Sequence, residues 1–254
     1  MPLFDLTGKK AFITGASRGI GQAIAVALAG AGADLALVAR SEDGLAETAA
    51  QVTTLGRKAF VIPADVTRQE SVAAAVAQAI DQLGYLDIVV NNAGGSSFMV
   101  PFLDLRLSGW DKLIRLNLDS AMYVCHAAGP HLVERGSGSV INIASVAGVS
   151  AAPFLAPYGA AKAGLISLTK SLAVEWGTLG VRVNALCPGW TATDLNRNLW
   201  EDETAGPATV ATVPMRRWGR PEEMSGPAIF LASEASSYMT GQVLLIDGGQ
   251  TAIS

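Results

Sequence analysis

Residues 10–21, Lys-Ala-Phe-Ile-Thr-Gly-Ala-Ser-Arg-Gly-Ile-Gly, decide the fold. The apolar run over residues 10–14 has the length of a buried strand, and it is followed at once by Gly15, Gly19 and Gly21. Glycines let a backbone turn tightly and approach a pyrophosphate, which then lies at the amino end of the next helix, predicted over residues 20–31. The stretch therefore predicts a strand, a turn and a helix that together hold a dinucleotide.

The alternation of apolar strands and helices continues along the chain. Further strands are predicted at 34–39, 59–62, 86–90, 139–144, 181–186 and 243–249, and helices at 42–55, 71–83, 108–134, around 158–162 and before 233. No linker divides the 254 residues. We therefore predict one α/β domain over residues 1–254, with a seven-stranded, parallel, doubly wound sheet and helices on both faces.

The composition argues against membrane and nucleic-acid partners. Half of the residues are apolar and the mean hydropathy is +0.35, yet Gly30, Gly32 and Asp34 interrupt the most apolar window, residues 23–39. That window therefore does not reach the ~20 residues of a membrane span. The net charge is −4 and the basic residues are scattered, which is not the pattern of a nucleic-acid or anionic-membrane surface. A small molecule is the expected partner.

The cysteines and histidines indicate neither a disulfide nor a metal site. Cys125 and Cys187 lie far apart within apolar stretches, as buried free thiols commonly do. His126 and His131 do not have the spacing of metal ligands, so we expect both to be structural. Residues 1–5 lack the basic start and apolar core of a signal peptide, and a cytoplasmic location is expected.

The end of the second strand predicts the cofactor. An acidic residue near this point binds the ribose of NAD, whereas an arginine accommodates the 2′-phosphate of NADP. Here Ala39 and Arg40 stand at the strand end, and Arg18 in the glycine turn is placed to reach the same phosphate. These residues predict NADP(H). The alternative is that Arg40 is a solvated residue beside Glu42 and Asp43.

A tyrosine and a lysine form the candidate catalytic pair. On a helix, Tyr158 and Lys162 lie one turn apart on the same face. A free phenol titrates near ~10, and a neighbouring cation favours the phenolate. Ser145 follows the strand predicted at 139–144, at the sheet edge where α/β proteins bind ligands. The three residues together predict proton transfer at a bound carbonyl or alcohol.

Three motifs carry a resemblance to a known family over essentially the whole chain. Thr14-Gly15-x-x-x-Gly19-x-Gly21, Asn91-Asn92-Ala93-Gly94 and Tyr158-x-x-x-Lys162 resemble those of short-chain dehydrogenases/reductases, which have a Rossmann fold. Among them, this chain is similar to 3-oxoacyl-carrier-protein reductases and to other ketoreductases and sugar or alcohol dehydrogenases. The resemblance implies that Asn117 interrupts its helix and holds a water of a proton relay. The candidate catalytic residues are Asn117, Ser145, Tyr158 and Lys162.

The resemblance also extends the predicted cofactor site. It implies that Asp65 contacts the adenine, although Asp65 could be only a helix cap, and that Thr191 and Thr193 meet the nicotinamide carboxamide and a phosphate. The predicted cofactor-binding residues are Gly15, Ser17, Arg18, Gly19, Ile20, Gly21, Arg40, Ser41, Asp65, Val66, Asn92, Ala93, Gly94, Tyr158, Lys162, Pro188, Gly189, Thr191 and Thr193.

The sequence also predicts a substrate lid and a class of substrate. Residues 190–217 have weak periodicity and are expected to form a substrate lid. The large side chains around the expected pocket favour an apolar ketone or 3-oxoacyl substrate, with a sugar or alcohol as the alternative; they are Phe98, Phe154, Trp190, Leu195 and Trp200. Three arginines in or beside the lid either meet an anionic carrier or pair with Glu201, Asp202 and Glu203; they are Arg197, Arg216 and Arg217.

Two further predictions concern the protein as a whole. The helices containing Asn117 and Tyr158 carry apolar residues around most of their surface, at 122–128 and 165–168. Such helices are covered on both sides, so a homotetramer formed through them and the C-terminal strand is expected. A non-catalytic NADP-binding sensor on the same scaffold is the competing class of function.

Overall fold

The structure is a computed structural model that describes residues 3–253. Its sheet has seven strands in the order β3-β2-β1-β4-β5-β6-β7, and each neighbouring pair is parallel. The predicted parallel α/β fold is therefore confirmed. The strands are β1 (Lys10–Thr14), β2 (Asp34–Ala39), β3 (Ala59–Pro63), β4 (Ile88–Asn91), β5 (Gly138–Ile143), β6 (Val181–Pro188) and β7 (Val243–Ile246).

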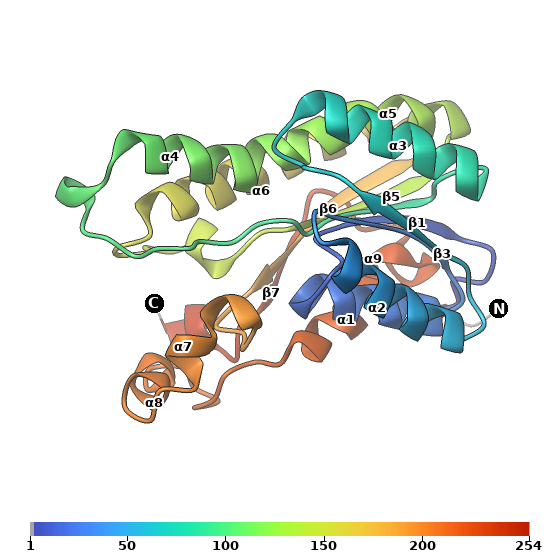
Figure 1. Ribbon diagram of the computed structural model, residues 1–254. Helices are drawn as coiled ribbons and strands as arrows, with labels where there is room; N and C mark the ends of the chain where they lie inside the picture. Colours follow the sequence, from blue (N-terminus) through green and yellow to red (C-terminus); the bar gives the residue numbers. More distant parts are fainter. Residues whose placement is uncertain (1–2, 254) are drawn as a thin grey trace.

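Helices cover both faces of this sheet (Figure 1). One layer contains α1 (Gly19–Gly30), α2 (Glu42–Thr54) and α9 (Ser225–Ala232). The other contains α3 (Gln69–Leu83), α4 (Leu107–Ile114), α5 (Ser120–Arg135) and α6 (Ala156–Gly177). Two short helices, α7 (Arg197–Trp200) and α8 (Ala205–Val210), lie away from both layers, on the side of the sheet where β7 ends.

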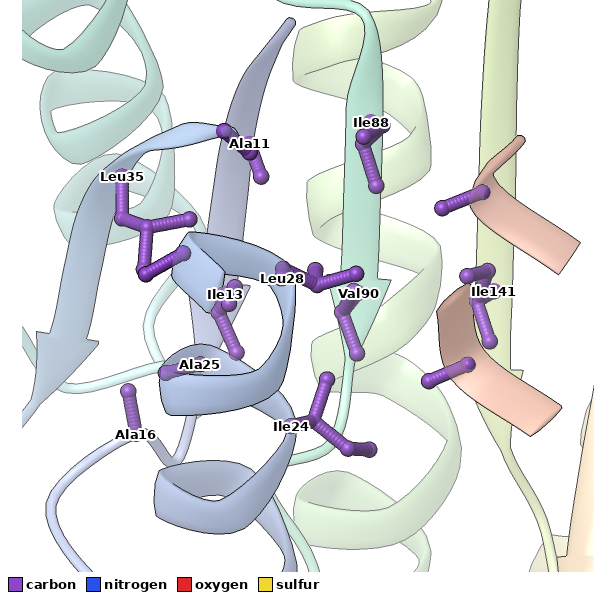
Figure 2. Packing of buried hydrophobic residues seen from close by; sticks show 14 of the residues in the cluster. Ala11, Ile13, Ala16, Ile24, Ala25, Leu28, Leu35, Ile88, Val90 and Ile141 are labelled. Atoms are coloured by element: carbon purple, nitrogen blue, oxygen red, sulfur yellow. The ribbon is translucent and has the colours of Figure 1, made fainter. Parts of the chain in front are cut away.

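Alternate residues of β1 build the two cores. Ala11 and Ile13 pack in the cluster that includes Ile24 and Leu28 of α1, and Figure 2 shows these side chains meeting. Phe12 points to the other face and joins the cluster formed with α3 and α5. Because successive strand residues face opposite sides, a continuous apolar run such as β1 is the sequence pattern of a sheet covered on both faces.

Several predicted boundaries differ from the structure. The single helix predicted at 108–134 is divided into α4, a π-helical segment Arg115–Asp119, and α5. The fourth strand begins at Ile88 and not at 86, because Leu86 N–H donates to His131 Nε2 at 3.0 Å, outside the sheet ladder. The predicted irregular stretch 190–217 contains α7 and α8, and a 3₁₀ turn precedes α9.

The cysteines are free and buried, at positions 125 and 187. Within residues 3–253, no helix combines the length and apolar character needed to cross a bilayer. The same residues contain no group of three or more His, Cys, Asp or Glu side chains placed to hold a metal ion.

Candidate active site

The site is a cleft of about 1410 Å³ along the edge where the parallel strands end. Every residue predicted to bind the cofactor lines this cleft, and so does Ser145. The parallel topology explains this convergence, because the carboxyl ends of all seven strands lie at one edge. Of the predicted catalytic residues, Asn117 alone does not line the cleft; it lies buried behind the wall.

The glycine turn is packed too closely for side chains. A Cβ on Gly21 would lie 2.2 Å from the carbonyl oxygen of Gly15 and 2.4 Å from Asn92 Nδ2. A Cβ on Gly15 would lie 2.9 Å from the Cα of Ala93, and Gly15 has φ +65°. The backbone is therefore bare where the turn opens into α1, as a backbone cradle for phosphate requires.

Asn92 joins this turn to the end of β4. Its Nδ2 donates to the carbonyl oxygens of Thr14 and Gly15 at 3.0 and 3.1 Å. The hydroxyl of Thr14 in turn accepts from the N–H groups of Asn92 and Ala93, both at 3.1 Å. These four bonds hold the two strand ends in one arrangement, which makes the dinucleotide cradle rigid.

Two arginines without ion pairs mark the predicted 2′-phosphate corner. Arg18 and Arg40 are exposed at the cleft, and neither belongs to an ion pair among residues 3–253. Arg40 forms no ion pair with Glu42 or Asp43. Ser41 lines the cleft and also caps α2, accepting from Gly44 N–H at 3.3 Å.

Asp65 lines the cleft but does not cap a helix. Its Oδ1 accepts from the N–H and hydroxyl of Thr67 at 3.0 and 2.8 Å, and α3 begins after Arg68 without a side-chain cap. The cap alternative is wrong because Asp65 lies too far before the helix and closes a local turn instead. Hydrogen bonding from Thr67, followed by other effects including the charge of Arg40, holds the pKa of Asp65 below its usual value.

Tyr158 and Lys162 stand together on the first turns of α6. The Nζ of Lys162 lies 5.7 Å from the centre of the Tyr158 ring and donates to the carbonyl oxygen of Ile143 at 2.7 Å. Lys162 is 3% exposed. Ser145, at the end of β5, accepts from Ala147 N–H at 3.1 Å, which fixes its hydroxyl in the same cleft.

The acidities of this pair differ from the sequence-based expectation. Burial raises the pKa of Tyr158, while its hydrogen bond with Ser145 acts in the opposite direction. Burial lowers the pKa of Lys162 to about 8. We expected the Lys162 ammonium to lower the pKa of the Tyr158 phenol. In the chain by itself burial has the larger effect, because both groups lose the solvation that favours their charged forms.

Asn117 lies in the π-helical segment between α4 and α5. Its Nδ2 donates to the carbonyl oxygens of Leu113 and Gly95, both at 3.0 Å, and its Oδ1 accepts from Gly95 N–H at 2.7 Å. A Cβ on Gly94 would lie 2.7 Å from that Oδ1 and 3.2 Å from Lys162 Nζ. Asn117 and Lys162 therefore both lie beside Gly94, and Asn117 does so from outside the cleft.

The substrate end of the cleft is less aromatic than expected. Trp190 and Leu195 line it, but Phe98, Phe154 and Trp200 do not. Phe154 is exposed, and the indole N–H of Trp200 donates to the carbonyl oxygen of Thr193 at 2.9 Å. Sequence reasoning missed several polar residues that line the cleft: Ser96, Ser97, Ser150 and Gln250. Gln250 directly follows the Gly-Gly pair after β7, a position at the ligand-binding edge that could have signalled it.

The lid arginines are mostly paired within the chain. Arg197 pairs with Asp194 and approaches Glu201 at 3.9 Å. Arg217 pairs with Glu223 at 2.7 Å, and not with an acid of residues 201–203. None of Arg197, Arg216 and Arg217 lines the cleft. They are not placed to hold an anionic substrate there.

A dinucleotide cradle that shares one cleft with a tyrosine and a buried lysine defines the site of an NAD(P)-dependent oxidoreductase. Comparison with known sequences agrees: the family model described as "Enoyl-(Acyl carrier protein) reductase" matches residues 15–251. The chain belongs to the short-chain dehydrogenase/reductase family.

Relatives within the family differ in the substrates their names state. The gluconate 5-dehydrogenase of Gluconobacter oxydans is 39% identical over 98% of this chain and 97% of its own. The rhamnolipid-biosynthesis 3-oxoacyl-(acyl-carrier-protein) reductase of Pseudomonas aeruginosa is 42% identical over 98% of each. A gluconate 5-dehydrogenase of Burkholderia cenocepacia, solved with NADP and tartrate, superimposes with a TM-score of 0.93 at 39% identity over 98% of each chain.

Proposed function

We propose that this protein interconverts a ketone and a secondary alcohol with NADP(H), using Tyr158 as the general acid and base. One observation carries the proposal: Tyr158 and the buried Lys162 line the same cleft as Ser145 and the unpaired arginines Arg18 and Arg40. A non-catalytic sensor would have no need of the acid, the ammonium and the hydroxyl in one cleft.

Ser145, Tyr158 and Lys162 have separate roles in the proposed reaction. When bound, the nicotinamide supplies or accepts a hydride. The Ser145 hydroxyl donates a hydrogen bond to the carbonyl oxygen and orients it. The Tyr158 hydroxyl, which like any phenol is protonated at neutral pH, gives its proton to the oxygen as charge develops there. Lys162 holds a ribose hydroxyl, and its charge favours the resulting phenolate.

The preference for NADP over NAD rests on charge. An acid at the end of β2 would repel a 2′-phosphate, and this chain has Ala39 and Arg40 there. Because Arg18 and Arg40 have no ion-pair partner among the described residues, both guanidinium groups are available for a phosphate. Two solved relatives carry NADP, which supports the same choice.

Two substrate classes are supported by different observations. Trp190, Leu195 and Met99 give the cleft an apolar wall, which supports a simple or 3-oxoacyl ketone. The serines and Gln250 support a hydroxylated substrate, as do the names of relatives such as D-threitol dehydrogenase. Arg197 and Arg217 are paired within the chain and Arg216 lies outside the cleft, so these three arginines do not support a carrier protein as the substrate.

We further propose that residues 190–217 act as the substrate lid of this single domain, and that four copies assemble through α5, α6 and β7. Large apolar side chains are exposed on these elements, including Met122, Val174 and Leu245 at 38, 82 and 40%. Such exposure supports a covered surface. Light scattering on the purified protein tests this: a monomer would contradict it.

The decisive experiment follows NADPH and NADH oxidation with a panel of simple, 3-oxoacyl and hydroxylated ketones. We expect turnover with at least one class and a higher kcat/KM for NADPH. Binding of NADPH without turnover of any ketone would favour the sensor, and a higher kcat/KM for NADH would contradict the cofactor assignment.

A further inference from the structure

The side-chain amide of Gln250 is an unused polar group of the cleft. Gln250 opens the 3₁₀ turn Gln250–Ile253 after β7 and lines the cleft. Its Oε1 is buried and accepts no hydrogen bond from residues 3–253. A buried amide oxygen without a partner is destabilising, because it has lost its hydrogen bonds to water. A ligand in the cleft can supply the partner that the chain does not.

The turn that carries Gln250 is held without the use of its amide. The Asp247 carboxylate accepts from Gly249 N–H at 2.9 Å and from the N–H and hydroxyl of Thr251 at 2.8 and 2.6 Å. Gly248 and Gly249 have φ values of +64° and +88°, which only glycine adopts without strain. The position of Gln250 is therefore set by its neighbours, and its amide remains available.

The amide lies beside Gly189, at the carboxyl end of β6. A Cβ on Gly189 would be 3.2 Å from Gln250 Oε1, and Gly189 N–H is bonded to the carbonyl oxygen of Ile246. Gly189 follows β6 and Ser145 follows β5, and neighbouring strands lie roughly 5 Å apart. Gln250 and Ser145 therefore line the same cleft near the ends of neighbouring strands, and a substrate that spans them would place a polar substituent beside the amide.

We infer that the Gln250 amide binds a hydroxyl group of the substrate on the carbon next to the reacting one, so that the enzyme selects hydroxyketones and vicinal diols. The inference rests on the proposed function and names its substrate class. Rotation about the last side-chain torsion of Gln250 exchanges the amide oxygen and nitrogen. A hydroxyl both donates and accepts hydrogen bonds, so it pairs with either atom. An apolar substrate would leave this group unpaired.

Gln250→Leu tests the inference, because leucine keeps most of the volume and removes the amide. The probes are 2-hydroxycyclohexanone and cyclohexanone, each reduced with NADPH. In the wild type, kcat/KM should be about 10-fold or more higher for the hydroxyketone, and Gln250→Leu should abolish most of this ratio. Gln78→Leu is the matched control on the exposed face of α3 and should keep it. The Kd of NADPH should be the same in all three proteins.

Two results would overturn the inference. One is an equal preference in wild type and Gln250→Leu. The other is a weaker Kd for NADPH in Gln250→Leu with the substrate ratio unchanged, which would assign the amide to the cofactor.

A failure of the proposed function is separable from a failure of the inference. If no ketone is reduced, the inference is judged by the rise in Tm with NADP⁺ and either 1,2-cyclohexanediol or cyclohexanol. A larger rise with the diol in the wild type but not in Gln250→Leu supports it, and equal rises contradict it.

Discussion

Asn117 binds both the N–H and the carbonyl oxygen of Gly95, at 2.7 and 3.0 Å, and so ties the π-helical segment to the loop after β4. Gly95 also lies against Leu195, because a Cβ there would be 2.4 Å from Leu195 Cδ2. One buried amide thus connects the helix break, the loop and the contact with Leu195.

Replacement of Asn117 should weaken both stability and turnover. Asn117→Leu removes the clamp and leaves the backbone groups of Gly95 without partners, which should lower the free energy of unfolding by about 1–3 kcal/mol. Because Asn117 Oδ1 and Lys162 Nζ both lie beside Gly94, loss of the amide should also disturb the lysine, and kcat should fall by about 10-fold or more. Urea unfolding and steady-state kinetics measure the two effects. Gln78→Leu, on the exposed face of α3, is the control, and equal behaviour of both variants would refute the clamp.

Removal of the phenol hydroxyl should separate chemistry from binding. Tyr158→Phe keeps the ring and removes the proton donor, so kcat should fall by about 100- to 10,000-fold. The Kd of NADPH, measured by fluorescence titration, should stay within about twofold, since the ring is retained. Near-normal turnover in this variant would show that another group supplies the proton.

Loss of the Arg40 guanidinium should change cofactor choice. Arg40→Ala removes a charged hydrogen-bond donor to the 2′-phosphate, and kcat/KM for NADPH should fall by about 10- to 100-fold. The value for NADH, which lacks that phosphate, should change little. Arg106→Ala, an exposed arginine outside the cleft, provides the comparison. Equal losses with the two cofactors would argue against a phosphate contact.

The buried ammonium should make stability depend on pH. Burial lowers the pKa of Lys162 from 10.5 to about 8, so protonating Lys162 in the folded state lowers the free energy of unfolding. This destabilisation is complete below pH 8. That cost is lost as the pH rises from 8 towards 10.5, where only the unfolded chain still binds the proton. Relative to Lys162→Met, the wild type should therefore gain about 2 kcal/mol in its free energy of unfolding between pH 7 and 10. Urea titrations at several pH values would show a constant difference if the ammonium were well solvated.

The sheet, the cradle and the catalytic pair could be predicted because each depends on local sequence. Gly15, Gly19 and Gly21 follow an apolar run at once, and Tyr158 and Lys162 are one helical turn apart. Periodicity and spacing are sufficient for such features.

The remaining features depend on contacts between distant segments. The break at Asn117 requires Gly95 as its partner, and the raised pKa of Tyr158 results from burial by the whole fold. The aromatic residues were misplaced for the same reason, since Trp200 is turned away by a bond to Thr193. Gln250 was missed because only the turn after β7 brings it beside Gly189.

The strand order has a consequence for how this scaffold can diversify. Arg40 follows β2 and Ser145 follows β5, which are three places apart in the sheet, or roughly 14 Å at the usual strand spacing. That separation exceeds the Debye length of about 8 Å at physiological ionic strength. A change of charge at the adenosine end therefore has little electrostatic effect on the reacting oxygen. Selection or engineering can alter the preference between NAD and NADP without altering proton transfer at Tyr158.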